Sequence, residues 1–350
     1  MRKYWSELVK NTEPYVPGEQ ANNKKYIKLN TNENPYPPSL KVIEAIKNNV
    51  DNKLRLYPDP SCQELKKIIS GYYGIKSKEV FVGNGSDEVL AFSFMAFFNP
   101  GKEILFPNIT YSFYPVYAKI FNINYKTVRL NKDFSLPFEE FFKSNGGIIF
   151  PNPNAPTGKD LPLSSIKKIL KKNINNIVII DEAYIDFGGE SAVGLVEDFP
   201  NLIVLQTFSK SRSLAGLRVG FALGQKHLIE ALARIKNSFN SYTLDRLALK
   251  GAIEAIKDNK YFEKTRYKII KTREKVSAKL RKMGFDVIGS KANFIFISPP
   301  DKNAEDLFKK LKENGILVRY FNQKEIKDYL RVSIGTDQEM DSFIKTLENF

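Results

Sequence analysis

Short apolar runs alternate with amphipathic segments along most of the chain, and this alternation constrains the fold more than any other feature. The runs are rich in β-branched or aromatic residues: Val80–Val82, Glu103–Phe106, Ile148–Phe150, Ile177–Ile180, Leu202–Leu205 and Val219–Leu223. Amphipathic stretches such as Ser164–Lys172 lie between several of them. Short apolar strands separated by helices predict an α/β fold with a mostly parallel central sheet covered by helices on both faces. Ligand sites in such sheets form beyond the carboxyl ends of the strands.

The last third of the chain has a different order of predicted helices and strands. A long helical pattern follows Asp258 and stops at Gly284, and the strand candidates Phe294–Ile297 and Leu330–Ile334 then flank a helix at Ala304–Asn314. We therefore expect a smaller α+β C-terminal domain. The expected division of the 350 residues is an N-terminal arm (1–30) packing with the small domain, a large domain (31–257), and a small domain (258–350) that begins with a long connecting helix.

Composition excludes several kinds of chemistry. The chain has one cysteine, Cys62, and one histidine, His227. Disulfide frameworks, Cys/His zinc sites, and Ser-His-Asp or Cys-His catalysis within one chain are therefore excluded, and we expect no metal site. Lysine, aspartate, tyrosine and arginine remain as the residues that can carry chemistry.

The charge pattern favours a cytoplasmic protein whose partners are small molecules. The net charge of +15 is scattered in pairs such as Lys167-Lys168, which is typical of solvated helix faces rather than of a nucleic-acid surface, although a basic nucleic-acid-binding protein stays an alternative. The longest nearly apolar run, 89–98, is far shorter than the roughly 18 to 20 residues that span a bilayer. The N-terminus lacks the apolar core of a secretory signal.

The segment Gly83–Glu88 follows a predicted strand and precedes an apolar helical run. Glycines permit a tight turn, and a helix N-terminus offers free N–H groups and a positive dipole end to an anion. The segment therefore suits a phosphate, although a plain turn capped by Ser86 or Asp87 explains it equally well. It is neither G-x-G-x-x-G nor a P-loop, so dinucleotides and nucleoside triphosphates are not indicated.

Two further strand ends carry reactive groups. Asp181 ends a strand that we expect to be buried on both faces, where a carboxylate is costly unless it meets a cation or a hydrogen-bond donor. A helix cap or a metal ligand would be alternative roles for it. Lys210 follows the next strand, with Arg218 eight residues later, and such an amine can attack a carbonyl to form a Schiff base. A Ser-Lys hydrolase would start from the same Ser209-Lys210 pair.

A phosphate site, a buried acid and an amine at the strand ends of one sheet together match the phosphate, ring nitrogen and aldehyde of pyridoxal 5′-phosphate. The chain here closely resembles the fold-type I pyridoxal-phosphate aminotransferases. The resemblance runs from about Leu29 to the C-terminus and rests on motifs in the family's order: Asn152–Gly158, Asp181–Tyr184, Ser209-Lys210 and Gly216–Arg218. Further signatures are most similar to those of histidinol-phosphate aminotransferases: Leu29–Pro35, Arg55–Asp59, Asp181–Tyr184 and Leu330–Gly335.

The resemblance implies specific roles around the cofactor. Lys210 binds the cofactor aldehyde and moves a proton between Cα and C4′, Asp181 keeps the pyridine nitrogen protonated, and Tyr184 hydrogen-bonds the ring oxygen O3′. Tyr111 stacks on the ring. Tyr57 reaches the phosphate of the neighbouring subunit, which makes the active unit a homodimer. The residues expected around the phosphate are Gly85, Ser86, Asp87, Ser209 and Arg218.

One position departs from the family's pattern. An asparagine stands directly before Pro-Thr-Gly in much of the family and bonds O3′, whereas this chain has Ala155 there. Either Asn154 substitutes from a shifted position, or Tyr184 makes the contact together with water.

The substrate is expected to bind through the small domain. By resemblance, Arg331 binds a carboxylate or phosphate of the substrate, Arg319 joins it around a phosphate, and Tyr15 closes over an imidazole. As alternatives, Arg319 is a surface residue and Tyr15 packs the arm.

The resemblance implies transamination of histidinol phosphate with 2-oxoglutarate, a step of histidine biosynthesis. An aromatic aminotransferase, a threonine-phosphate decarboxylase and a catalytically silent regulator of the same fold are the other readings. The fold alone does not decide between these substrates.

Overall fold

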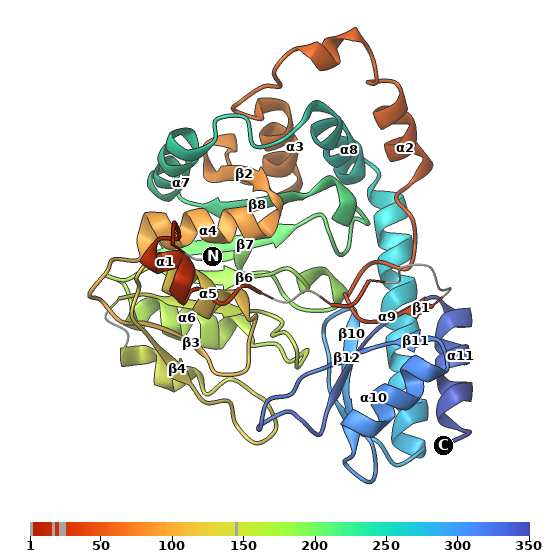
Figure 1. The fold of residues 1–350 in the computed structure, drawn as a ribbon. Helices are drawn as coiled ribbons and strands as arrows, with labels where there is room; N and C mark the ends of the chain where they lie inside the picture. The colour runs from red at the N-terminus through yellow and green to blue at the C-terminus, as the bar shows by residue number, and fades with distance from the viewer. Residues whose placement is uncertain (1–2, 16–17, 21–25, 144–145) are drawn as a thin grey trace.

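A computed structural model describes residues 3–15, 18–20, 26–143 and 146–350. Within these residues seven strands form one sheet in the order β2-β8-β7-β6-β5-β3-β4, seen from top to bottom in Figure 1. Neighbouring strands pair in parallel except β8, which is antiparallel to both β7 and β2. The strands are β2 (Val80–Asn84), β3 (Ile104–Pro107), β4 (Tyr125–Val128), β5 (Ile148–Pro151), β6 (Val178–Asp181), β7 (Leu202–Thr207) and β8 (Val219–Gly224).

Helices cover both faces of this sheet because alternate strand residues point to opposite sides. Ile179 and Ile203 pack into the core under α4, α5 and α7, whereas Val178 and Val204 pack into the core under α3, α6 and α8. All four side chains are fully buried, so the strands are apolar along their whole length. The predicted α/β fold is confirmed. The helices are α4 (Gly85–Phe97), α5 (Phe113–Ile120) and α7 (Lys226–Phe239) on one face, and α3 (Gln63–Tyr73), α6 (Leu163–Lys172) and α8 (Arg246–Lys257) on the other.

A smaller α+β unit follows the long helix α9 (Asn259–Lys282), as the sequence predicts. Its four strands are antiparallel, in the order β12-β13-β10-β9 among the described residues, and its core is separate from those of the large sheet. The strands are β9 (Asp286–Ile288), β10 (Phe294–Ser298), β12 (Arg319–Tyr320) and β13 (Leu330–Ser333), and the helices are α10 (Ala304–Glu313) and α11 (Asp337–Leu347).

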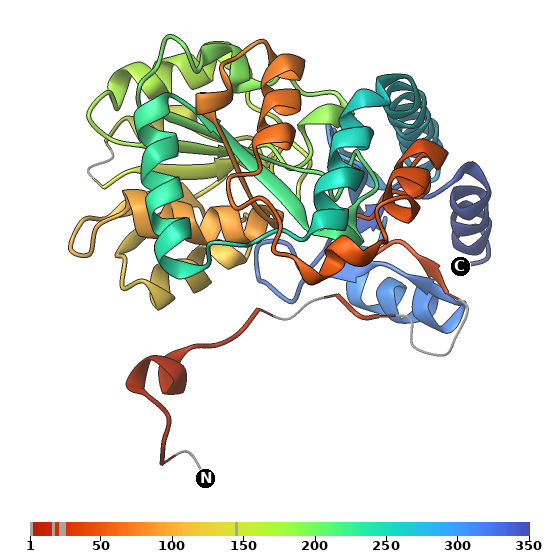
Figure 2. The same ribbon diagram turned by 90° about the horizontal axis from the view of Figure 1, so that it is seen from above.

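Helix α1 (Glu7–Asn11) of the N-terminal arm has no buried residue and lies on the outside of the molecule (Figure 2). Further along the arm, β1 (Ile27–Lys28) pairs in parallel with β11 (Ile316–Leu317) of the small unit. A further helix, α2 (Leu40–Lys47), leads into the large unit. Short 3₁₀ helices lie at Asn52–Arg55, Ser77–Glu79, Phe138–Lys143, Ile185–Phe187, Ala192–Leu195 and Ala215–Leu217.

The polar ends of several strands meet at one edge of the large sheet. β6 ends at Asp181, β7 ends at Thr207, and β2 ends at Asn84, which pairs with Val219 at the start of the antiparallel strand β8. Arg218, immediately before β8, therefore lies at the same edge. None of the helices that the structure describes is both long and apolar enough to cross a membrane.

Candidate active site

A cavity of about 160 Å³ lies at this edge, between the large sheet and the small unit. It contains most of the residues that the sequence predicts for a site, contributed by the N-terminal arm, both units and four strand ends. The predicted residues that line it are Tyr15, Ser86, Asp87, Tyr111, Asp181, Tyr184, Ser209, Lys210, Arg218, Arg319 and Arg331. Gly85, Asn154 and Tyr57 do not line it.

One end of the cavity is built for an anion. Gly85 begins α4 with φ +77°, and a Cβ there would approach the guanidinium of Arg218 to 2.5 Å. Gly220 leaves room in the same way, since a Cβ at this position would collide with the backbone N of Ser86. The two glycines let the Arg218 guanidinium and the N-terminus of α4 converge, and both attract a phosphate.

Asp87 connects this end of the cavity to an aromatic ring. One carboxylate oxygen of Asp87 accepts a hydrogen bond from Arg218 at 2.8 Å, and the other accepts one from the hydroxyl of Tyr111 at 2.8 Å. Burial and the neighbouring Asp87 raise the pKa of Tyr111 well above its ordinary value, so this hydroxyl remains protonated. The Tyr111 ring is thereby fixed over the cavity.

Asp181 supplies a buried acid. It is 4% exposed, and its carboxylate accepts hydrogen bonds from the Tyr114 hydroxyl at 3.1 Å and the backbone N of Ala183 at 3.2 Å. Asp181 forms no ion pair with any residue that the structure describes. Burial raises the pKa of Asp181 to about 6. A buried carboxylate without a cationic partner suits a protonated ring nitrogen of a bound cofactor.

Lys210 lies in the turn after β7 and lines the same cavity. Its Nζ donates a hydrogen bond to the backbone oxygen of Thr31 at 3.3 Å and lies 5.8 Å from the centre of the Tyr184 ring. No carboxylate within the described ranges pairs with Lys210. An amine held by one carbonyl can react with an aldehyde. The anion site, the acid and the amine thus fit the phosphate, ring nitrogen and aldehyde of pyridoxal phosphate.

Ala155 and Tyr184, the two residues that the sequence connects with O3′ of the cofactor, both line the cavity. The neighbouring Asn154 turns its amide away, donating to the backbone oxygen of Ile109 and to the Thr157 hydroxyl, both at 3.0 Å. The buried Oδ1 of Asn154 has no hydrogen-bond partner within the described structure. A contact of Asn154 with the cofactor therefore stays a prediction.

Two arginines close the small-unit side of the cavity. Arg319 and Arg331 are directly opposite each other on β12 and β13. Arg331 donates to the backbone oxygen of Asn30 at 3.0 Å, but its buried Nε has no hydrogen-bond partner in the described part of the chain, and no described carboxylate pairs with it. Burial, together with the neighbouring Arg319, lowers the pKa of Arg331. This pair of guanidinium groups is suited to an anionic ligand.

Tyr15 reaches the cavity from the N-terminal arm. Its ring stacks on Phe113 with 4.4 Å between ring centres and lies 6.4 Å from the ring of Tyr111. Tyr15 thus both packs the arm and borders the cavity beside the two arginines.

The sequence of the chain matches a family model described as aminotransferase class I and II over residues 24–347. The chain belongs to this family. Its cofactor is pyridoxal phosphate, and it is a pyridoxal-phosphate-dependent transaminase.

Relatives of this aminotransferase cover its full length. It is 62% identical to the histidinol-phosphate aminotransferase of Clostridium acetobutylicum, with 99% of each chain covered. It is 59% identical to the histidinol-phosphate aminotransferase of Clostridium botulinum strain Okra, with 99% of this chain and 98% of that one covered. A solved structure of histidinol-phosphate aminotransferase from Sinorhizobium meliloti in complex with pyridoxal-5′-phosphate has the same fold, with a TM-score of 0.90 at 21% identity over 99% of this chain and 97% of that one.

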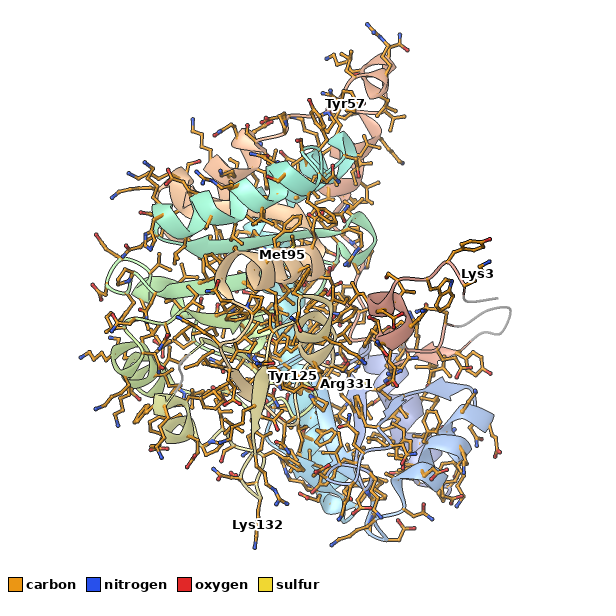
Figure 3. The ribbon with its side chains drawn as sticks, turned by 60° about the vertical axis from the view of Figure 1, so that its left-hand side comes forward. Lys3, Tyr57, Met95, Tyr125, Lys132 and Arg331 are labelled. Atoms are coloured by element: carbon orange, nitrogen blue, oxygen red, sulfur yellow. The ribbon has the colours of Figure 1, made fainter. Side chains whose placement is uncertain are left out.

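Tyr57 of this aminotransferase lies far from its own cavity. It is 78% exposed, and its ring stacks on Tyr242 with 4.5 Å between ring centres. Figure 3 shows it at the far end of the molecule from Arg331. The predicted contact of Tyr57 with the cofactor phosphate of a neighbouring subunit stays a prediction.

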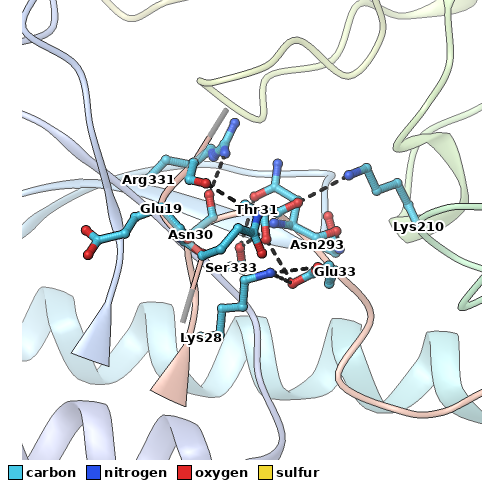
Figure 4. Close-up of polar contacts among 12 residues, drawn as sticks. Glu19, Lys28, Asn30, Thr31, Glu33, Lys210, Asn293, Arg331 and Ser333 are labelled. Atoms are coloured by element: carbon cyan, nitrogen blue, oxygen red, sulfur yellow. Dashed lines mark hydrogen bonds and ion pairs between the residues drawn. The ribbon is translucent and has the colours of Figure 1, made fainter. Parts of the chain in front are cut away.

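A segment of the aminotransferase that sequence reasoning treated only as a signature makes four contacts at the site. The backbone oxygens of Asn30 and Thr31 accept from Arg331 and Lys210, respectively (Figure 4). The Asn32 amide donates to the Tyr184 hydroxyl at 3.0 Å, and the Asn34 amide donates to the backbone oxygen of Lys210 at 3.0 Å. The density of asparagines in Leu29–Pro35 is the signal in the sequence, but it does not reveal their partners.

Proposed function

We propose that the protein transfers the amino group of histidinol phosphate to 2-oxoglutarate, producing imidazole-acetol phosphate and glutamate in histidine biosynthesis. The observation that carries this proposal is the pair formed by Arg319 and Arg331, because two guanidinium groups suit a phosphate dianion better than a single carboxylate. The names of the full-length relatives support the same donor. Arg331 also holds a carboxylate of 2-oxoglutarate in the second half-reaction.

Most residues around the cofactor hold it in place, and one of them, Lys210, also moves a proton. Pyridoxal phosphate, when bound, supplies an aldehyde that takes up the amino group and a ring that withdraws electrons from Cα of the substrate. Asp181 holds a proton at the ring nitrogen, because its carboxylate is buried without another cation. Lys210 anchors the aldehyde, removes the proton from Cα and delivers it to C4′. Tyr184 donates a hydrogen bond to O3′.

The remaining predicted contacts follow from the anion end of the cavity. Arg218 and the N-terminus of α4 hold the phosphate, and Tyr111 covers the ring face. Asn154, whose amide donates to the backbone oxygen of Ile109, contacts the cofactor through its side-chain oxygen Oδ1. The residues that complete the phosphate end are Gly85, Ser86, Asp87 and Ser209.

Tyr15 closes the cavity over the imidazole ring of the donor, a role supported by its stacking on Phe113 at the cavity mouth. The active unit is a homodimer in which Tyr57 reaches the phosphate of the partner, and its 78% exposure supports such a role. The enzyme is cytoplasmic and consists of an N-terminal arm (1–30), a large domain (31–257) and a small domain (258–350).

The rival donors differ from histidinol phosphate in their charge. Phenylalanine and tyrosine present one carboxylate and need chiefly one guanidinium. Threonine phosphate presents a phosphate but would lose CO₂ instead of exchanging its amino group with 2-oxoglutarate. The names of the relatives favour neither of these readings.

A donor panel tests the proposal. The purified holoenzyme is given histidinol phosphate, phenylalanine, tyrosine, aspartate or threonine phosphate with 2-oxoglutarate, and glutamate and the keto product are identified by mass spectrometry. We expect the highest kcat/KM for histidinol phosphate. A Lys210→Ala preparation purified identically controls for host enzymes. A preference for phenylalanine or tyrosine, or release of CO₂ from threonine phosphate as the main reaction, would contradict the proposal.

A further inference from the structure

The cavity wall around Ala155 offers few hydrogen-bond donors. Ala155 is 5% exposed, lines the cavity and has no polar side-chain atom. The amide of Asn154 is already committed to Ile109 and Thr157. Donation from this wall to the ring hydroxyl oxygen of the cofactor therefore depends on the hydroxyl of Tyr184.

A phenolic hydroxyl has one hydrogen and can both donate and accept, so its usefulness as a donor depends on what its other neighbours do. Asn32 is the neighbour that decides this. It is 1% exposed, and its amide Nδ2 lies 3.0 Å from the Tyr184 hydroxyl. Since an amide N–H can only donate, the hydrogen of Tyr184 cannot point at it.

The orientation of the Asn32 amide is fixed by partners in the small unit. Its backbone N donates to the Ser333 hydroxyl at 2.8 Å, and that hydroxyl donates back to Asn32 Oδ1 at 3.0 Å. The Asn293 amide donates to the backbone oxygen of Asn32 at 3.0 Å. With Oδ1 facing Ser333, Nδ2 is left to face Tyr184. Ser333 lies two residues beyond Arg331 on β13, so the strand that carries the substrate arginine also holds Asn32.

We propose that Asn32 is a positioning residue that sets the direction of hydrogen bonding at Tyr184: by donating to the phenolic oxygen, it turns the hydroxyl hydrogen toward the ring oxygen of the cofactor. The inference rests on the proposed function in placing Tyr184 beside that oxygen. A hydroxyl that accepts one hydrogen bond also donates a stronger one, so Asn32 both aims and strengthens the donor. In this chain, Asn32 acting through Tyr184 takes over the donation that Ala155 cannot provide.

The test is a pH titration of the visible absorbance of the bound cofactor in the holoenzyme, without any amino donor. A hydrogen bond to the ionised ring oxygen stabilises the deprotonated form of the bound cofactor and so lowers its pKa. Loss of the hydrogen bond from Tyr184 should therefore raise the midpoint of the absorbance titration. Asn32 has φ +55°, a left-handed conformation that glycine and aspartate also adopt, so two variants avoid backbone strain. Asn32→Gly removes the donor, and Asn32→Asp replaces it with an acceptor that draws the Tyr184 hydrogen away.

We expect Asn32→Asp to raise the midpoint by about one pH unit and Asn32→Gly to raise it by less. Asn30→Asp is the matched control, because it adds the same charge to the same cavity beside Arg331 and should move the midpoint little. In a Tyr184→Phe background, Asn32→Gly should have no further effect, since its route of action is gone.

Two results would overturn the inference: an unchanged midpoint in both Asn32 variants, or an equal shift from Asn32→Gly with and without the Tyr184 hydroxyl. If the Asn32 variants do not fold, Ser333→Ala gives the answer, because it frees the Asn32 amide to turn and should raise the midpoint in the same direction. An unchanged midpoint in Ser333→Ala would then overturn it. Because no donor is present, failure of the histidinol phosphate panel leaves this titration unaffected, and the reverse also holds.

Discussion

Asp181→Asn should make the cofactor-free protein more stable at alkaline pH while damaging catalysis. The pKa of Asp181 is raised from its ordinary value of 3.8 to about 6 by burial. Well below pH 3.8 the carboxyl is protonated in both the folded and the unfolded state, so its ionisation does not affect stability. Between about pH 4 and 6 the unfolded chain loses this proton while the folded protein keeps it, so the free energy of unfolding falls by about 3 kcal/mol and stays at the lower value at higher pH.

Asparagine has nearly the same shape and does not titrate, so the variant avoids this cost. Its oxygen can still accept from the backbone N of Ala183, and the Tyr114 hydroxyl can rotate to accept from the new amide group. We therefore expect the variant to gain about 1 to 3 kcal/mol at pH 8 and little at pH 4. Glu182, whose pKa burial raises to about 7, is present in both proteins and cancels from the comparison.

The assay is urea unfolding of both cofactor-free proteins at the two pH values, at one protein concentration. Far-UV circular dichroism is the appropriate signal, because the single tryptophan, Trp5, is 46% exposed on the N-terminal arm. Adding pyridoxal phosphate should reverse the order of stability, since only the carboxylate gains a charged partner at the ring nitrogen. A variant that is less stable than the wild type at pH 8, or a difference that does not change with pH, would refute the reasoning.

Two further predictions concern the substrate and the subunit interface. Arg319→Ala should weaken histidinol phosphate binding by about 2 kcal/mol or more, seen as a raised KM, and should affect any reaction with phenylalanine far less. Arg331→Ala should damage the reactions with both donors. Equal effects of Arg319→Ala on the two donors would contradict the two-arginine argument. Mixing inactive Lys210→Ala subunits with inactive Tyr57→Ala subunits should restore activity after subunit exchange, because one site of each heterodimer then carries both changes and the other carries neither. No recovery despite verified exchange would place Tyr57 outside the partner's site.

The architecture and the edge that carries the site could be predicted because they depend on patterns along the chain. A continuous apolar run such as 202–205 predicts a strand buried on both faces, as in a parallel sheet, and these residues are fully buried in the structure. Asp181 and Lys210 follow such strands directly, so their meeting at one edge follows from the topology. The two-residue strands β1, β11 and β12 are too short to produce a period in the sequence, and we did not predict them.

The contacts that orient the reactive side chains could not be predicted, because they depend on tertiary neighbours. Asn32 and Asn154 are both buried asparagines in family motifs, yet the amide of Asn32 faces Tyr184 and that of Asn154 faces the backbone of Ile109. Tyr114 is one of 17 tyrosines, and only the fold shows that its hydroxyl meets Asp181. Residue type identifies the chemistry that is available, and the packing decides where it is directed.

The most direct test of the account is to locate the lysine that binds the cofactor. The holoenzyme is reduced with borohydride, which makes the bond between cofactor and lysine permanent, then digested and mapped by mass spectrometry. The account predicts one pyridoxyl group per chain, on Lys210, the lysine at the edge of the sheet that also presents Asp181 and the anion site. A pyridoxyl group on another lysine, or the same yield of reduced adduct from Lys210→Ala, would contradict it.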